Sequence, residues 1–202
     1  MIKRTLVATA MAFALASGGA HAANVIDTGT PTGYTYSFNK NDYFAGEFSF
    51  AGAAVIDSIQ AYFSTASGNV AISVFSDAGG LPGSALYSTT LATTAGGLSW
   101  NGVSGLDWAV AANTNYWVVF APDYSATLAV APEVRDGAPS PMAAYALYHD
   151  YSVGVWQANE FNQAYGVRIG ATVAAVPEPA GIAMYALGLA GLAVVARRRK
   201  QA

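Results

Sequence analysis

The sequence predicts an all-β fold, more narrowly an antiparallel β-sandwich that is jelly-roll-like. The first observation is that apolar and polar residues alternate with a period of two along much of residues 23–175, as in strands with one buried face. The second is that Gly, Pro, Asn, Asp and Ser separate these runs, and the third is that no convincing amphipathic helix lies between them. Roughly eight to ten short strands without intervening helices should pair antiparallel and form a sandwich.

Five segments carry the clearest strand patterns. Three of them place apolar residues on one parity: Tyr34, Tyr36 and Phe38; Phe44, Phe48 and Phe50; Val70, Ile72 and Val74. In a fourth, Ile56 and Tyr62 share a parity with Ser58 and Gln60, which predicts that Ile56 and Tyr62 lie on the same face. The fifth, Tyr116 to Phe120, is apolar without a break, so we expect a buried strand with Trp117 in the core.

Residues 1–22 have the three parts of a secretory signal peptide. Lys3 and Arg4 form a positive start, and the uncharged, largely apolar run 5–16 is too short to span a bilayer comfortably as a helix. A small-x-small pattern follows, which a signal peptidase accepts. The expected cleavage site comprises Ala20, Ala22 and Ala23. The alternatives are an uncleaved anchor or a buried helix.

Residues 176–202 contain three different pieces in a fixed order. Pro177, Glu178 and Pro179 come first, an uncharged stretch 180–196 follows, and Arg197, Arg198, Arg199 and Lys200 come last. As a transmembrane helix, the uncharged stretch would be about 25 Å long, the lower limit for spanning a bilayer. The basic cluster is a stop-transfer signal that stays on the cytoplasmic side, which places residues 23–175 outside the inner membrane. A permanent anchor and a processed tail both fit this pattern.

The order of Pro177-Glu178-Pro179, span and basic cluster resembles the PEP-CTERM sorting signal. The resemblance implies recognition by an exosortase, a membrane-embedded cysteine transpeptidase that would cut near the motif. It also implies a transient membrane anchor, followed by delivery to the cell surface or to an extracellular matrix rich in exopolysaccharide. Removal of a terminal hydrophobic tail has a parallel in the GPI signal.

The segment between the two signals is acidic. Six of the nine Lys and Arg lie within the predicted signals at residues 3–4 and 197–200. Between Ala23 and Val176 three basic residues face eleven acidic ones, a net charge of −8. Such a segment repels phosphate backbones, so we expect no nucleic-acid partner. Cysteine is absent, so the sequence predicts no disulfide and no thiol chemistry.

The block from Val70 to Phe120 resembles the "choice-of-anchor" class of bacterial surface domains. A strand is followed by the turn-rich loop 77–83, then Leu86-Tyr87, a variable part, and the run 112–118 (Ala-Asn-Thr-Asn-Tyr-Trp-Val). The terminal run 164–169 fits the same pattern. The resemblance implies a β-sandwich and brings no known active site or ligand.

The sequence predicts no catalytic residue. His149 is the only histidine after the signal peptide, and no G-x-S-x-G elbow accompanies it. The pair Glu133 and Asp136 would suit glycoside hydrolysis, but eleven acids make some close pairs inevitable. We expect a protein that is not an enzyme; an extracellular hydrolase using His149 and Asp150 is the weaker alternative.

Two ligand hypotheses remain open, and neither predicts a required cofactor. Calcium is the first, because Asn39, Asn41 and Asp42 cluster between two strands, and Asp77 and Asp123 lie in expected loops. Asn and Asp are also favoured in turns without a metal. Sugar is the second, because exposed aromatic rings can stack on it. The candidates for sugar contact are Tyr145, Tyr148, Tyr151 and Trp156.

Taken together, the sequence predicts a non-enzymatic, exported surface or extracellular-matrix protein associated with exopolysaccharide or biofilm. Its partners would be signal peptidase, exosortase, the inner membrane before processing, and a polysaccharide. A carbohydrate-binding module is the main alternative.

Overall fold

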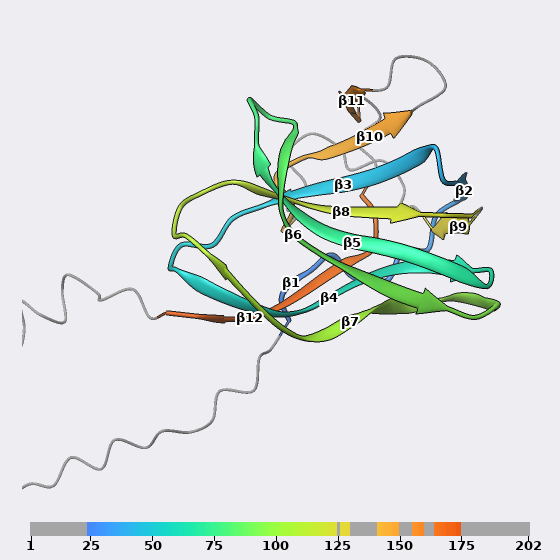
Figure 1. The fold of residues 1–202 in the computed structure, drawn as a ribbon, viewed down its shortest axis with the longest axis horizontal. Helices are drawn as coiled ribbons and strands as arrows, with labels where there is room; N and C mark the ends of the chain where they lie inside the picture. Colours follow the sequence, from blue (N-terminus) through green and yellow to red (C-terminus); the bar gives the residue numbers. More distant parts are fainter. Residues whose placement is uncertain (1–23, 125, 130–140, 150–154, 160–163, 175–202) are drawn as a thin grey trace, which may run out of the picture.

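The computed structural model describes residues 24–124, 126–129, 141–149, 155–159 and 164–174. Within these residues twelve strands form two antiparallel sheets that pack face to face (Figure 1). The predicted signal peptide and sorting tail, residues 1–22 and 176–202, lie outside the described part of the chain. In the described part, no helix has the length and apolar character needed to cross a membrane.

The first sheet, sheet A, is organised around β4 (Ala54–Thr65). One edge of β4 pairs along its length with β7 (Gly96–Val110), and the other edge pairs with β12 (Val167–Val173) and then β9 (Ala126–Ala129). Two short strands complete the sheet: β1 (Asn24–Asp27) beside β12, and β2 (Thr35–Phe38) beside β9. The first and last described strands are therefore neighbours, although they come from opposite ends of the described chain.

The second sheet, sheet B, has six strands in the order β11-β10-β3-β8-β5-β6. Their bounds are β11 (Val155–Ala158), β10 (Tyr145–His149), β3 (Asp42–Phe48), β8 (Tyr116–Pro122), β5 (Gly68–Asp77) and β6 (Pro82–Thr93). The central strand β8 comes from a region of the sequence distant from β3 and β5, its two neighbours. Long-range pairing therefore decides which side chains meet on this sheet.

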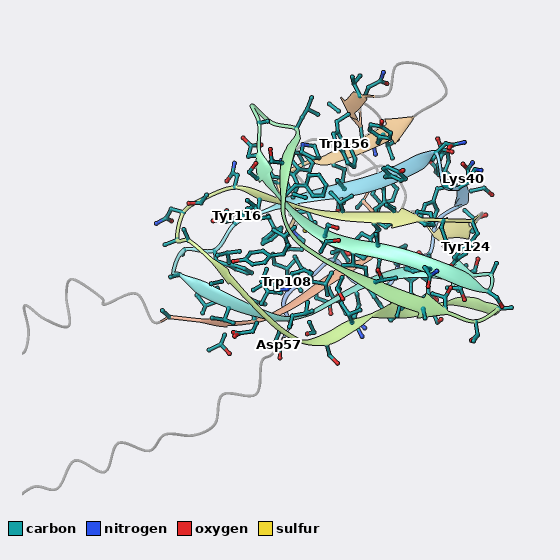
Figure 2. All side chains as sticks on the ribbon, viewed as in Figure 1. Lys40, Asp57, Trp108, Tyr116, Tyr124 and Trp156 are labelled. Carbon is teal, nitrogen blue, oxygen red and sulfur yellow. The ribbon has the colours of Figure 1, made fainter. Side chains whose placement is uncertain are left out.

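The main core fills the space between the two sheets, where the side chains are drawn as sticks in Figure 2. Its largest members are aromatic: Phe44 stacks on Phe120 with ring centroids 4.8 Å apart, and the ring of Phe38 meets Phe44 edge-on at 5.3 Å. These geometries are the ones that aromatic quadrupoles prefer. The apolar parity of the strands thus produces a continuous aromatic and aliphatic layer.

Most of the predicted strand faces are confirmed. Phe44, Phe48 and Phe50 are all buried, as are Val70, Ile72 and Val74, and the run 116–120 is buried throughout. In the first predicted strand Phe38 is buried, but Tyr34 lies before β2 and is exposed. The terminal run 164–169 contributes to β12, which begins at Val167.

The prediction that Ile56 and Tyr62 share a face is wrong. Ile56 is fully buried, but farther along β4 the buried residues are Ile59, Ala61 and Phe63. The pairing of β4 with β7 shifts register between Ile56 and Ser58, and an irregularity in β12 lies opposite the same place. Because a β-bulge inserts one extra residue, it reverses the parity of everything beyond it. Tyr62 therefore lies on the opposite face, with its ring against Trp100.

The strands are also longer and more numerous than the eight to ten short ones expected. β4 and β6 have 12 residues each and β7 has 15. The Ser- and Thr-rich run 88–93 belongs to β6. A strand at the edge of a sheet can carry hydroxyl side chains because its outer face is solvated. The jelly-roll connectivity stays a prediction.

Candidate ligand-binding face

A second, smaller apolar cluster lies on the outer face of sheet B, away from the main core. We call it the outer cluster; its members are Tyr43, Ala45, Phe75, Leu81, Trp117, Val119, Ala144, Ala146 and Trp156. It arises from strand alternation: Phe44 and Phe48 point into the main core, so Ala45 between them points the other way. The predicted burial of Trp117 is confirmed, but its ring belongs to this outer cluster and not to the space between the sheets.

The outer cluster requires sheet B to curl over itself. Trp156 is on β11 and Phe75 is on β5, with β10, β3 and β8 between them in the sheet. Four strand spacings on a flat sheet amount to about 19 Å, yet the two ring centroids are 6.4 Å apart. The link between β5 and β6 also rises from the sheet on the side of β10 and β11 (Figure 1), and its Leu81 packs on the cluster. The outer face is therefore covered by side chains from both of its margins.

The predicted sugar-contact residues are divided between the two faces of sheet B. Tyr148 and Trp156 are half-buried at the outer cluster: Tyr148 stacks on Tyr43 at 5.0 Å and meets Trp156 at 5.5 Å. Tyr145 has the opposite parity and contacts Tyr165 of the main core. Tyr151 lies outside the described residues. The structure thus brings together two of the four candidates.

One margin of the outer cluster carries carboxylates. Glu47 on β3 lies directly opposite Trp117 on β8, and Glu47 is only 7% exposed. Its Oε1 accepts a hydrogen bond of 2.7 Å from Nδ2 of Asn115. On the other side, the indole Nε1 of Trp117 donates to Oδ1 of Asp77 at 2.9 Å. The Trp117 indole therefore lies between two acids, 40 residues from Asp77 in sequence.

The surroundings of Glu47 favour its protonated form. Burial raises the pKa of this carboxyl, the negative charge of Asp77 raises it further, and only the hydrogen bond from Asn115 lowers it. Of the two basic residues in the described part, Arg168 pairs with Asp27 on sheet A, and Lys40 lies in the turn between β2 and β3. Glu47 is therefore more readily protonated than a solvent-exposed glutamate.

A polar hollow of about 460 Å³ opens beside these acids. Its lining consists of Ser76, Asp77, Asn113, Thr114, Asn115 and Tyr116. Two of these lining residues are hydrogen-bonded to the outer cluster and its margin: Asp77 to the Trp117 indole, and Asn115 to Glu47. Its volume lies in the range of small-molecule sites. The hollow offers hydroxyl, amide and carboxylate groups, which are the groups that recognise a polar ligand with several hydroxyls.

The Asp77 carboxylate is held in place by the turn that follows it. The backbone N–H of Gly79 donates to its Oδ2 at 3.2 Å, and that of Gly80 donates to its Oδ1 at 3.1 Å. Gly79 and Gly80 have φ of 72° and 84°, a region that favours glycine. Asn113, on the opposite wall, also has a positive φ of 50°, and its N–H donates to the carbonyl of Phe50 at 2.7 Å. Both walls of the hollow are therefore anchored through the backbone.

The predicted calcium candidates form a turn between β2 and β3. Asn39 Nδ2 donates to Oδ2 of Asp42 at 2.9 Å, and the N–H of Asn41 donates to Oδ1 of Asn39 at 3.0 Å. These bonds are what Asn and Asp contribute to turns. Asp123 similarly accepts the N–H and Nδ2 of Asn69, which lowers its pKa. Within the described ranges no group of three or more His, Cys, Asp or Glu gathers as for a metal ion.

The predicted catalytic alternative falls largely outside the structure. Glu133, Asp136 and Asp150 are not among the described residues. The backbone of His149 is described at the end of β10, opposite Asp42 of β3. The hydrolase hypothesis stays a prediction on these grounds.

The sequence did not predict Glu47, Asn113 or Asn115 as ligand-binding residues; Asn113 and Asn115 entered only through the run 112–118 of the choice-of-anchor resemblance. The signal for Glu47 was its place among Phe44, Ala45, Gly46 and Phe48, a run in which a charged residue is unusual. Its partner was not readable, because Asn115 is 68 residues away and meets it only through the pairing of β3 with β8.

No protein-family model matches the chain, and no curated protein matches it. Among solved structures, it is similar to the cysteine protease and lectin-like domains of Cwp84, a surface layer associated protein of Clostridium difficile. That match has 11% sequence identity and a TM-score of 0.49, and covers 69% of this chain and 36% of the other. A second clostridial Cwp84 structure, determined after propeptide cleavage, matches at 12% identity with a TM-score of 0.50, over 70% of this chain and 40% of the other. The chain spans less than half of those proteins, and the likeness concerns the β-sandwich fold alone.

Proposed function

We propose that this chain is an exported, non-enzymatic surface or extracellular-matrix protein that an exosortase processes and that associates with exopolysaccharide. The observation that carries the proposal is the ordered sequence of Pro177-Glu178-Pro179, the uncharged stretch 180–196 and the basic cluster 197–200. A span followed by a basic cluster orients the preceding domain away from the cytoplasm. The signal peptide predicted at residues 1–22 leads to the same topology.

The sandwich supports this proposal as a compact unit for display. Its described part packs an aromatic and aliphatic main core between two sheets, and the chain has no cysteine, so no disulfide contributes to this packing. Its described charges are mainly acidic, which suits solubility on a cell surface. In this proposal the strand connectivity is jelly-roll-like and the block 70–120 belongs to the choice-of-anchor class.

The intact mass of the mature protein, isolated from a bacterium that encodes an exosortase, tests this proposal. We expect the mass of a polypeptide that begins at Ala23 and ends near Pro177. Deleting the exosortase, or replacing Glu178 in a Glu178→Ala variant, should leave the basic tail attached. A mature protein that keeps Arg197 to Lys200 in the exosortase-positive strain would instead be a permanent membrane anchor, and one that still begins at Met1 would contradict export.

Carbohydrate binding is the second candidate function, and one observation favours it. The outer face of sheet B carries half-buried aromatic rings, and a polar hollow lies beside them. Aromatic surfaces beside hydrogen-bonding groups are suited to sugars, which have both apolar faces and hydroxyls. This candidate is compatible with display on the surface.

A further inference from the structure

We propose that the hollow lined by Ser76, Asp77 and residues 113–116 binds a hexosamine unit with a free ammonium group, within an amino-sugar polymer. This inference rests on the proposed association with exopolysaccharide and names the sugar chemistry and the face that would contact it. Three observations lead to it: the volume of the hollow, the polar groups that line it, and the sign of the charges around it.

The size and lining of the hollow suit one or two sugar units. Its volume of about 460 Å³ lies in the range of small-molecule sites. Ser76, Thr114 and Asn115 contribute hydroxyl and amide groups, which both donate and accept hydrogen bonds. A sugar hydroxyl also does both. The hollow therefore matches a polyhydroxylated ligand better than an apolar one.

The charges distinguish among sugars. Asp77 lines the hollow, and Glu47 binds Asn115 directly behind it. No Lys or Arg is among the lining residues. An ammonium group at the hollow would meet the Asp77 carboxylate and no cationic lining residue, whereas a uronic acid would be repelled. Charge complementarity thus selects an amine-bearing sugar over a neutral one and excludes an acidic one.

The site is pre-formed. The Asp77 carboxylate is oriented by Trp117 and by the backbone of Gly79 and Gly80, and Asn113 is anchored to Phe50 through its backbone. Side chains held in this way lose little conformational freedom when a ligand binds. Trp156 and Tyr148 lie farther along the same face, where the next units of a polymer would pass.

The test measures binding of three oligosaccharides to the full-length chain in detergent by calorimetry: a glucosamine tetramer, an N-acetylglucosamine tetramer and a galacturonate tetramer. We expect the glucosamine tetramer to bind, the neutral tetramer to bind at least tenfold more weakly, and the acidic one not to bind. Preference for the neutral or the acidic tetramer, or no binding of any, would overturn the inference.

Two variants localise the interaction. Asp77→Asn keeps the oxygen that accepts the Trp117 bond and removes the charge, and Asn113→Gly removes an amide while suiting the positive φ. Each should weaken glucosamine binding tenfold or more, while Asp107→Asn, which removes an exposed charge from β7 of sheet A, should not. An equal loss in all three would indicate general electrostatic attraction and contradict the site.

If Asp77→Asn fails to fold, Asn113→Gly decides the question by itself. Loss of binding in Asn113→Gly with an unchanged melting temperature supports the site, and unchanged binding refutes it. The outcome is independent of the tail: the mass of the mature protein tests processing, so a chain that is processed correctly but binds no amino sugar disproves only this inference.

Discussion

The main core and the outer cluster of this sandwich are built from the same strands, yet they differ in what surrounds them. The main core lies between two sheets, and its buried members are apolar or aromatic. The outer cluster lies on one face of sheet B and borders Glu47, Asp77 and a polar hollow. Among the described residues, the main core is enclosed between the two sheets, and the outer cluster is covered by side chains from the margins of sheet B.

This difference assigns the two regions different roles. A core between sheets is selected for packing, because every lost contact leaves a cavity there. A covered outer face needs a further reason to bury carboxyls, because burial without a cation costs free energy. The burial of Glu47 beside the Trp117 indole is such a cost, and ligand binding is the reason we propose.

The largest expected loss of stability comes from a substitution of Phe44 in the main core. Phe44→Ala removes a ring that stacks on Phe120 and is 1% exposed. We expect a loss of about 3–5 kcal/mol in the free energy of unfolding, measured by urea denaturation. A loss below that of an outer-cluster variant would contradict the assignment of the main core as the principal source of stability.

Trp156→Ala should have a smaller effect. Trp156 is half-buried and packs on the outer cluster, in which Ala45 and Ala146 are fully buried. We expect a loss of about 2 kcal/mol in the free energy of unfolding, because part of the ring is already in contact with solvent. Trp156→Phe is the matched control and should recover most of that loss. Equal stability of wild type and Trp156→Ala would mean that the Trp156 ring contributes nothing to the free energy of unfolding.

Glu47→Gln sharpens the comparison through pH. The raised pKa of Glu47 means that its contribution to stability is fully present below the unfolded pKa, about 4.3, and is lost as the pH rises through the folded value. Gln cannot ionise, so the variant should gain stability relative to the wild type between pH 4 and pH 7, by less than the Trp156 effect. Thermal melting at the two pH values measures this, with Asp107→Asn as the control. A stability difference that does not change with pH would refute it.

Asp123→Asn should show the opposite and smallest trend. Hydrogen bonds from the backbone and side chain of Asn69 lower the pKa of Asp123, so its contribution is present above its unfolded pKa and is lost as the pH falls. We expect the variant to melt slightly lower than the wild type at pH 7 and to converge with it in acid. Because Asp123 is exposed, its hydrogen bonds with Asn69 should contribute little to stability. A large change in melting temperature would contradict this expectation.

Sequence reasoning succeeded where a feature depends on neighbours along the chain. The burial of Val70, Ile72 and Val74 followed from their alternation, and the turn at residues 77–83 followed from its Gly, Pro and Asp content. It failed at β4, where a bulge after Ile56 reversed the parity of Tyr62. The position of a bulge depends on the strands paired on either side, and the sequence of β4 contains no signal that predicts it.

The sequence by itself determined the all-β class, the faces of the regular strands and the pattern of residues 176–200 on which the sorting proposal rests, because these depend on periodicity and order along the chain. Only the tertiary structure decided that Glu47 and Asp77 flank Trp117 and that Trp156 reaches Phe75. The physical reason is that alternation places a side chain on one face of its strand, whereas its neighbours on that face come from strand order, register and curl, which long-range pairing sets.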